Sequence, residues 1–144
     1  MRNNVTITLC GSLKFHDKMQ ECARLLRKAG HTVFVPVFVS GVDYWSDDGA
    51  KRIEAKKGMN LIKEHFEKIN TSDAILVINV TKRDVVDYIG ANTFLEIGYA
   101  HYLGKTIYLL NDFPDQPYLN EELRTINPVP LRGDLQPLLK SLAS

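Results

Sequence analysis

Stretches with the pattern of buried strands alternate with stretches of helical periodicity along the chain of 144 residues. The strand-like stretches are residues 4–10, 31–39, 73–80 and 105–111, with 127–131 as a candidate edge strand. The helix-like stretches are residues 15–29, 50–70, 93–103 and 119–126, with a last short helix capped by Asp134. This alternation predicts an α/β fold, in which right-handed crossovers place helices on both faces of a parallel sheet.

The helical stretches have apolar residues at alternating spacings of four and three, which is one face of a helix. The first face comprises Phe15, Met19, Cys22, Leu26 and Ala29, and the second comprises Ala55, Met59, Ile62, Phe66 and Ile69. Residues 73–80 are almost wholly apolar, which is typical of a strand covered on both faces. With four to five strands, a flavodoxin-like three-layer sandwich with strand order 2-1-3-4-5 is the simplest arrangement.

The length and composition indicate one globular domain that spans residues 1–144. A net charge of +1 gives no electrostatic reason to expect nucleic acid or an anionic membrane surface as a partner. No apolar run is long enough to span a bilayer, and the N-terminus lacks the apolar length of a signal peptide, so we expect a cytoplasmic protein.

The two cysteines, Cys10 and Cys22, fall on expected apolar positions and lack the CxxC spacing. They are interpreted as buried thiols in a reducing compartment. No cluster of histidine, cysteine and aspartate is visible along the sequence, so we expect neither a metal site nor a cofactor.

A parallel sheet of this order binds ligands beyond the carboxyl ends of the first and third strands. The loops at these positions are Gly11–Asp17 and Thr81–Asn92. In the first loop, Gly11 and Ser12 offer backbone N–H groups to an anion at a helix N-terminus, and Lys14 adds a positive charge. This signal is weak alone, because many strand-to-helix turns of this kind bind nothing, and no GxGxxG motif is present.

The second loop leads to Glu96, an acid among apolar neighbours in YIGANTFLEIGYA. One interpretation is structural: Thr93 caps the helix, and Glu96 completes a capping box three residues later. The other is chemical: a carboxylate at this edge of the sheet attacks an anomeric carbon, as the nucleophile of a retaining glycosidase does. The spacing alone favours the cap, and both interpretations remain open. Asn92 is a further candidate, either for capping the helix or for binding a ribose.

Three stretches, LCGSLKF, SDAILVINV and IGANTFLEIGYAHYLGK, together resemble the nucleoside 2-deoxyribosyltransferase superfamily, which includes deoxynucleoside 5'-monophosphate N-glycosidases. The resemblance implies a flavodoxin-like fold, with Glu96 as the nucleophile that forms a glycosyl-enzyme intermediate. It also implies that Gly11 and Ser12 contact the 5' end of a nucleoside or nucleotide. Gly90 and Asn92, in the matching YIGANTFLE stretch, become candidate substrate-binding residues.

The sequence departs from the family pattern at two places. The family has an aspartate eight residues before the acid that opens the third strand, where this sequence has His65 before Asp73. An aromatic residue on the first strand is also missing, because the comparable positions are Leu9 and Cys10. Either His65 protonates the leaving base or it is an ordinary helix residue. Asp84 and Asp87, in the loop before Glu96, are the other candidates for the missing acid.

Other polar and aromatic residues lie near the same edge of the predicted sheet. Tyr44 and Trp45, after the second strand, either stack on a base or pack over the core. Lys51, Arg52, Lys56 and Lys57 are interpreted as a solvated helix face.

Two functions follow as hypotheses. The first is an enzyme that cleaves or exchanges the N-glycosidic bond of a nucleoside or nucleotide through Glu96. The second is a catalytically silent nucleotide-binding or sensing module on the same fold. The resemblance also implies a homodimer or larger oligomer, and we expect Thr93–Leu103 and Pro114–Ser144 to contribute to an interface above about 1,000 Å².

Overall fold

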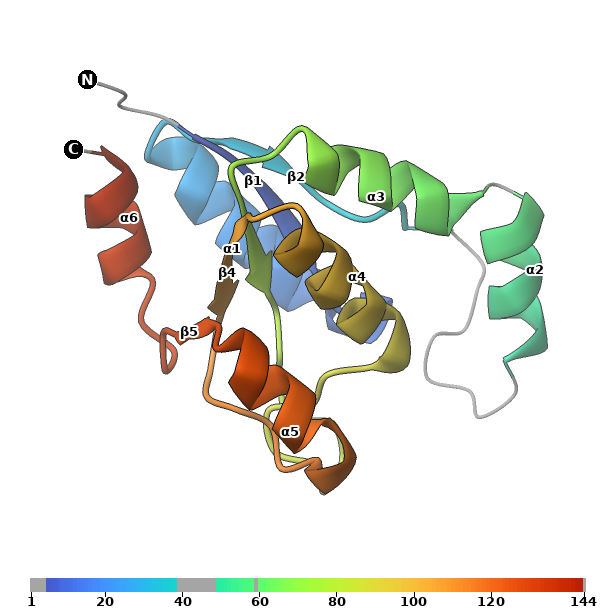
Figure 1. Ribbon diagram of the computed structural model, residues 1–144. Coiled ribbons are helices and arrows are strands. Elements are labelled where there is room, and N and C mark those ends of the chain that lie inside the picture. The colour runs from blue at the N-terminus through green and yellow to red at the C-terminus, as the bar shows by residue number, and fades with distance from the viewer. Residues whose placement is uncertain (1–4, 39–48, 59, 144) are drawn as a thin grey trace.

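The computed structural model describes residues 5–38, 49–58 and 60–143. Its centre is a five-stranded, all-parallel sheet with the order β2-β1-β3-β4-β5, as predicted (Figure 1). The strands are β1 (Thr6–Cys10), β2 (Thr32–Phe34), β3 (Ala74–Val77), β4 (Thr106–Leu109) and β5 (Val129–Pro130). In the register of the two central strands, Ile7 lies opposite Ala74 and Cys10 opposite Val77, so both strands end at the same edge.

A short 3-10 helix and six α-helices connect and cover the strands. They are η1 (Leu13–Phe15), α1 (His16–Lys28), α2 (Ala50–Gly58), α3 (Leu61–Asn70), α4 (Ala91–Tyr102), α5 (Pro117–Ile126) and α6 (Gln136–Ala143). Gly30 and Gly104, which follow α1 and α4, have positive φ angles of 98° and 74°. This left-handed conformation costs glycine little, which agrees with the helix ends expected at both positions.

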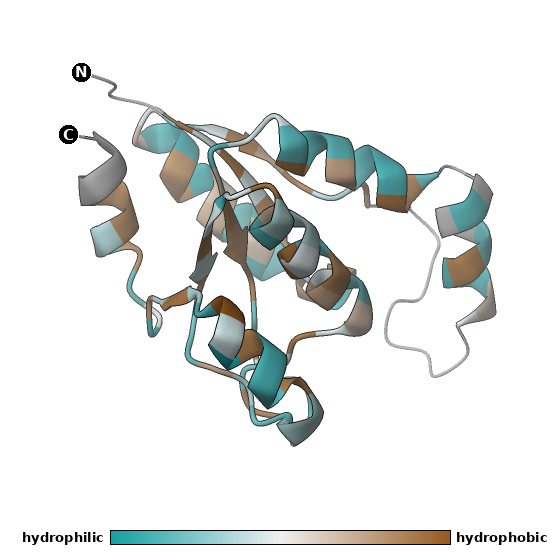
Figure 2. Cartoon of the chain, in the orientation of Figure 1, coloured by the Kyte–Doolittle hydropathy of each residue, from teal (hydrophilic) through white to brown (hydrophobic). Residues whose placement is uncertain are grey.

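Two hydrophobic clusters, one on each face of the sheet, make the three-layer sandwich. Buried residues of α1 and α6 pack with one set of strand side chains, whereas those of α3, α4 and α5 pack with the other set. All four residues of β3 are buried, as its apolar sequence predicted. In Figure 2 the apolar colour follows the central strands, and the polar colour covers outward parts of α3 and α5. Burial of these two apolar faces is the main stabilising contribution to the fold.

The single long helix expected over 50–70 is wrong, because the chain forms α2 and α3 instead. Asn60 lies between them in the left-handed region, with φ 51° and ψ 44°, which interrupts the helical path. Figure 1 shows α2 turned away from α3 and standing clear of the sheet. The apolar stripe expected for one helix is therefore divided between two.

None of the helices in the described ranges combines the length and apolar character needed to cross a membrane.

Candidate active site

A pocket of about 360 Å³ lies where β1 and β3 end. The two loops expected to meet there both line it, as do residues of α2, α3 and α4. Its lining residues are Gly11, Ser12, Leu13, Lys14, Pro36, Val37, Arg52, Leu61, Ile62, His65, Lys82, Tyr88, Gly90, Ala91, Asn92, Thr93 and Glu96. Of the candidates from the sequence, Gly11, Ser12, Lys14, His65, Gly90, Asn92 and Glu96 are thus brought together.

The turn after β1 passes so close to other atoms that a side chain at Gly11 would be crowded. A Cβ atom at Gly11 would lie 3.1 Å from the Ile78 carbonyl oxygen and 3.3 Å from the Met19 methyl group. Ser12 is the N-cap of η1, and its hydroxyl accepts a hydrogen bond from the Lys14 N–H at 3.3 Å. Gly11 thus allows the loop to approach β3 closely, and Ser12 holds the next residues against the pocket.

The capping box expected for Thr93 and Glu96 is wrong. Helix α4 begins at Ala91 with Gly90 as its N-cap, so Asn92 and Thr93 already lie inside its first turn. Neither residue is the cap, and the Gly90 position has no side-chain cap hydrogen bond. Glu96 lies in the second turn, too far along the helix for its carboxylate to return to the cap. Capping of α4 therefore does not explain why Glu96 is buried.

The Glu96 carboxylate lies beside His65 in the wall of the pocket. Glu96 is only 3% exposed, and its Oε2 atom is 3.4 Å from the Nε2 atom of His65 on α3. The same Nε2 atom lies 3.1 Å from the carbonyl oxygen of Leu9 and 3.7 Å from the Sγ atom of Cys10. The end of β1 and the middle turns of α3 and α4 thus place a thiol, an imidazole and a carboxylate together.

His65 is a hydrogen-bond donor in this arrangement. Burial, and to a smaller extent Lys68, lower its pKa to about 4, so the imidazole is neutral near pH 7. Because Nε2 faces the Leu9 carbonyl and the Glu96 carboxylate, both acceptors, we assign its proton to Nε2. Burial, together with the neighbouring Glu96 carboxylate, raises the pKa of the Cys10 thiol, which keeps it protonated.

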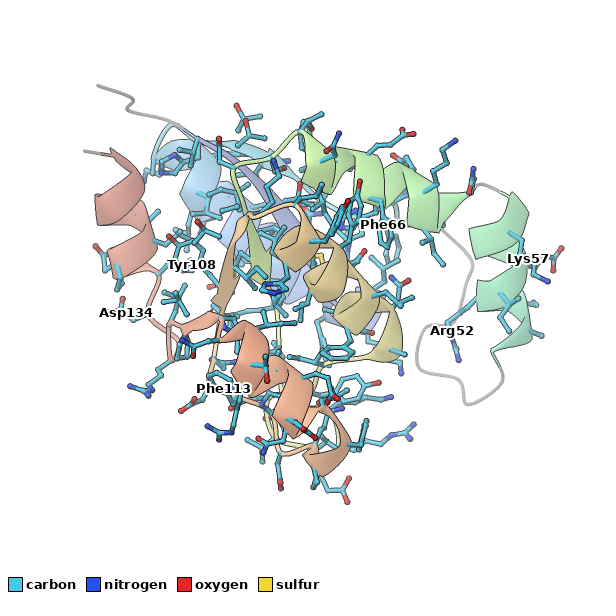
Figure 3. All side chains as sticks on the ribbon, viewed as in Figure 1. Arg52, Lys57, Phe66, Tyr108, Phe113 and Asp134 are labelled. Carbon is cyan, nitrogen blue, oxygen red and sulfur yellow. The ribbon has the colours of Figure 1, made fainter. Side chains whose placement is uncertain are left out.

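Positive charge gathers on the other side of the pocket. Burial and the adjacent Lys82, followed by Arg52 and Arg83, lower the pKa of Lys14 to about 8. Figure 3 shows the Arg52 side chain on the side of α2 that faces α4, with Lys57 on its opposite side. The sequence suggested that Arg52 belongs to a solvated helix face. This interpretation is wrong for Arg52, because its side chain lines the pocket. Such a concentration of cations favours an anionic ligand.

An apolar part of the pocket was not expected from the sequence. It is formed by Pro36 and Val37, which follow β2, and by Leu61 and Ile62 in the first turn of α3. Tyr88 adds an aromatic ring, with the Lys82 ammonium 4.7 Å from its centre. These residues come from separate segments, so the sequence could not predict that they line one pocket. The only available signal was that residues 36–37 follow the second strand, at the edge of the sheet where ligands bind.

The loop that leads to α4 is held by a side chain missed in the sequence. The Gln116 amide pairs with both backbone groups of Ile89: it accepts from the N–H at 2.7 Å and donates to the carbonyl at 2.9 Å. Gln116 is 3% exposed and immediately precedes α5. This pairing fixes the backbone just before Gly90, and hence the start of the helix that carries Glu96.

The remaining candidates do not join the pocket in the described part of the chain. Asp87, with a positive φ of 56°, is not a lining residue, and burial raises its pKa despite the opposing effect of a hydrogen bond with the Asp112 backbone. Asp84 is exposed in the same loop and is also not a lining residue. Tyr44 and Trp45 lie outside the described residues.

The sequence matches no family model and no curated protein. Among solved structures, it is similar to a 2-deoxyribosyltransferase from the psychrotolerant bacterium Bacillus psychrosaccharolyticus, with a TM-score of 0.52 and 23% identity over 72% of this chain and 70% of that one. A second similar structure is the CMP N-glycosidase BcmB of Clostridium botulinum, with a TM-score of 0.51 and 18% identity over 95% and 97% of the two chains.

A third similar structure is a 2-deoxyribosyltransferase from Leishmania mexicana, with a TM-score of 0.51 and 19% identity. The match covers 72% of this chain and 62% of that one. The three similarities show that this chain shares its fold with nucleoside 2-deoxyribosyltransferases and a nucleotide N-glycosidase.

Proposed function

We propose that this protein cleaves the N-glycosidic bond of a nucleoside or nucleotide, with Glu96 as the nucleophile and water or a second base as the acceptor. The observation that carries the proposal is the buried Glu96 carboxylate, which lines the pocket beside a neutral imidazole donor and serves no helix cap. The fold shared with enzymes that act on N-glycosides agrees with this chemistry.

The reaction has two displacement steps at the anomeric carbon. An oxygen of Glu96 forms a bond to this carbon while the carbon–nitrogen bond breaks, and the electron pair leaves with the base, which takes a proton from solvent. Water or a second base then attacks the same carbon, gives up a proton to solvent and releases the carboxylate. In this scheme the enzyme replaces one difficult step by two easier ones through a glycosyl ester.

The pocket offers separate surroundings for the three parts of a nucleotide. Lys14, Arg52 and Lys82 suit a 5'-phosphate, because they are cations close to the Gly11–Ser12 turn. The apolar wall at Pro36, Val37, Leu61 and Ile62 suits a base, and Gly90 and Asn92 lie near Glu96, where the sugar would sit.

His65 acts in this proposal as a positioning residue. Its Nε2–H group is shared between the Leu9 carbonyl and the Glu96 carboxylate, so it orients the nucleophile. Its low pKa makes it a poor reservoir for the proton that the leaving base needs. This assignment differs from the acid role considered from the sequence.

The test is release of free base, measured by chromatography over a panel of ribo- and deoxyribonucleosides and their 5'-monophosphates. Glu96→Gln should lower the rate by at least about 1,000-fold, because an amide cannot form the glycosyl ester. Glu122→Gln, on the exposed face of α5, is the matched control and should keep the wild-type rate. An active wild-type protein whose Glu96→Gln variant is equally active would refute the nucleophile assignment.

Binding is tested separately by thermal shift. We expect monophosphates to stabilise the protein more than the corresponding nucleosides, because only the former reach the cations around Lys14. If nucleotides bind but no member of the panel reacts, the second hypothesis, a nucleotide-binding module without catalysis, is the better one.

A further inference from the structure

Three side chains with different metal-binding atoms converge at the inner end of the pocket. The Sγ atom of Cys10, a ring nitrogen of His65 and a carboxylate oxygen of Glu96 all lie within 4.8 Å of one another, and all three residues are buried. They come from β1, α3 and α4, so no spacing in the sequence could have indicated the cluster. A mixed sulfur, nitrogen and oxygen set of this kind suits zinc and similar divalent transition metals.

Two of the three separations agree with tetrahedral coordination, and the third, between the Cys10 Sγ atom and a Glu96 carboxylate oxygen, is at most 4.8 Å. Zinc bonds of about 2.3 Å to sulfur and about 2.0–2.2 Å to nitrogen and oxygen, at tetrahedral angles, place sulfur about 3.5 Å from nitrogen and nitrogen about 3.4 Å from oxygen. In the protein the Cys10 Sγ–His65 Nε2 distance is 3.7 Å, and the His65 Nε2–Glu96 Oε2 distance is 3.4 Å. An ion could therefore be held with only small movements of these side chains.

Two of the three side chains of the cluster border the pocket. His65 and Glu96 line the pocket, whereas Cys10 lies behind them and is not a lining residue. An ion can thus reach the cluster from the pocket, with a water molecule completing its coordination. Three protein ligands and one open position are the arrangement found in reactive rather than purely structural zinc sites.

We propose that Cys10, His65 and Glu96 form a binding site for Zn²⁺ at the inner end of the pocket. Binding releases the thiol proton of Cys10 to solvent, because a zinc-bound thiol is deprotonated. The His65 proton moves from Nε2 to Nδ1, so that Nε2 can donate its electron pair to the metal. This change breaks the hydrogen bond to the Leu9 carbonyl and leaves the Nδ1–H group buried without a partner among the described residues, so metal binding must offset both costs.

Zinc at this site and attack by Glu96 exclude each other. Coordination of one carboxylate oxygen withdraws electron density from both oxygens and fixes the group beside the ion, which weakens Glu96 as a nucleophile. Zinc therefore inhibits base release, and a chelator restores it. This consequence rests on the proposed function, whereas the binding site itself does not.

Binding is tested with Co²⁺ as a spectroscopic substitute for Zn²⁺ in the whole chain of 144 residues. The wild type should give the near-ultraviolet charge-transfer band of a cobalt–thiolate bond and the intense visible bands of tetrahedral cobalt, and one equivalent of Zn²⁺ should remove both. Cys10→Ser should abolish the charge-transfer band. Cys22→Ser is the matched control and should keep it, because Cys22 packs in the cluster on the opposite face of the sheet.

Affinity for Zn²⁺, measured by competition with a chromophoric chelator, gives a second readout. Glu96→Gln and Cys10→Ser should each weaken binding by about 100-fold or more, since even an outer-shell partner is worth about 10–100-fold. Circular dichroism establishes that each variant is folded, and Glu96→Gln, which keeps the side-chain size, serves if Cys10→Ser does not fold. A wild-type protein without the cobalt–thiolate band, or a band that persists in Cys10→Ser, overturns the site.

The two proposals fail in different ways. If the cobalt spectrum appears but no substrate reacts, the metal site stands and the proposed function falls. If base is released but neither Co²⁺ nor Zn²⁺ binds, the proposed function stands and the metal site is wrong. If Zn²⁺ binds with the expected variant pattern while base release is unaffected by it, the mutual exclusion is wrong.

Discussion

The charge state of Lys14 links the pocket to pH. Its pKa is lowered to about 8 by burial and by Lys82, Arg52 and Arg83, so a large fraction of Lys14 loses its proton above this pH. A bound phosphate favours the protonated form, so its binding raises the pKa again. Above about pH 8, binding must therefore take up a proton, and affinity must fall as pH rises.

We expect the affinity for a nucleoside monophosphate to fall by up to about tenfold between about pH 7 and pH 9. Isothermal titration calorimetry in buffers of different ionisation enthalpy would measure both the affinity and the proton uptake. Lys14→Arg, which stays charged across this range, should make the affinity nearly independent of pH. An equal decline in the Lys14→Arg variant would show that another group titrates.

Single residues differ in how far their roles could be predicted from the sequence. Glu96 stands out in the sequence because an acid in an apolar segment at the edge of a parallel sheet is unusual, and its role as the nucleophile stays a prediction. His65 was one of three candidate partners for Glu96, and the sequence could not single it out, because their contact depends on the packing of α3 against α4. Cys10 was interpreted as a buried thiol, which is correct, but its position 3.7 Å from His65 joins residues 55 apart in the chain.

At the scale of elements, the position of α4 depends on the Gln116–Ile89 pairing. Gln116→Leu removes the partner of a backbone N–H and of a carbonyl, both at a buried position. We expect a loss of about 2–3 kcal/mol in the free energy of unfolding, measured by urea denaturation, and slower base release as the start of α4 shifts. Gln136→Leu, at an exposed position of α6, is the control and should change stability by less than about 0.5 kcal/mol.

Unchanged stability and unchanged base release in Gln116→Leu would mean that the loop before α4 is fixed by other contacts.

The strand order and the approximate positions of the helices were predicted correctly from the sequence. The residues at which helices begin and end were predicted less accurately. Apolar periodicity identified the faces that pack on the sheet, because burial drives that packing. It could not show that Asn60 adopts a left-handed conformation between α2 and α3, since the apolar spacing continues across it. The start of α4 was misplaced by two residues for a related reason: Thr93-x-x-Glu96 fits a capping box in sequence, but the helix begins earlier, after Gly90.

At the scale of the whole molecule, the outer surfaces of α4 and α5 remain apolar in places. Leu95 and Tyr102 on α4 are 56% and 84% exposed, and Tyr118 on α5 is 74% exposed. Large apolar side chains that are exposed in a single chain are candidates for burial in an interface. They favour the homodimer that we predict from the sequence.

We expect light scattering at micromolar concentration to give the mass of a dimer, and Leu95→Lys to shift it towards a monomer, because a charge at the centre of an interface is costly to bury. Arg24→Glu, on the exposed side of α1 across the sheet, is the control and should leave the dimer intact. A monomeric wild type would rule out the dimer.

The pocket draws its chemical groups and its apolar wall from different parts of the chain. Glu96 and His65 lie on helices packed against the sheet, whereas Pro36, Val37 and Arg52 belong to segments outside that packing. Changes at these three positions therefore carry a small risk of unfolding the protein or displacing the carboxylate. Under selection for a new substrate, a lineage could therefore change its base preference at Pro36 and Val37, and its preference for a phosphate at Arg52, while inheriting the same reaction.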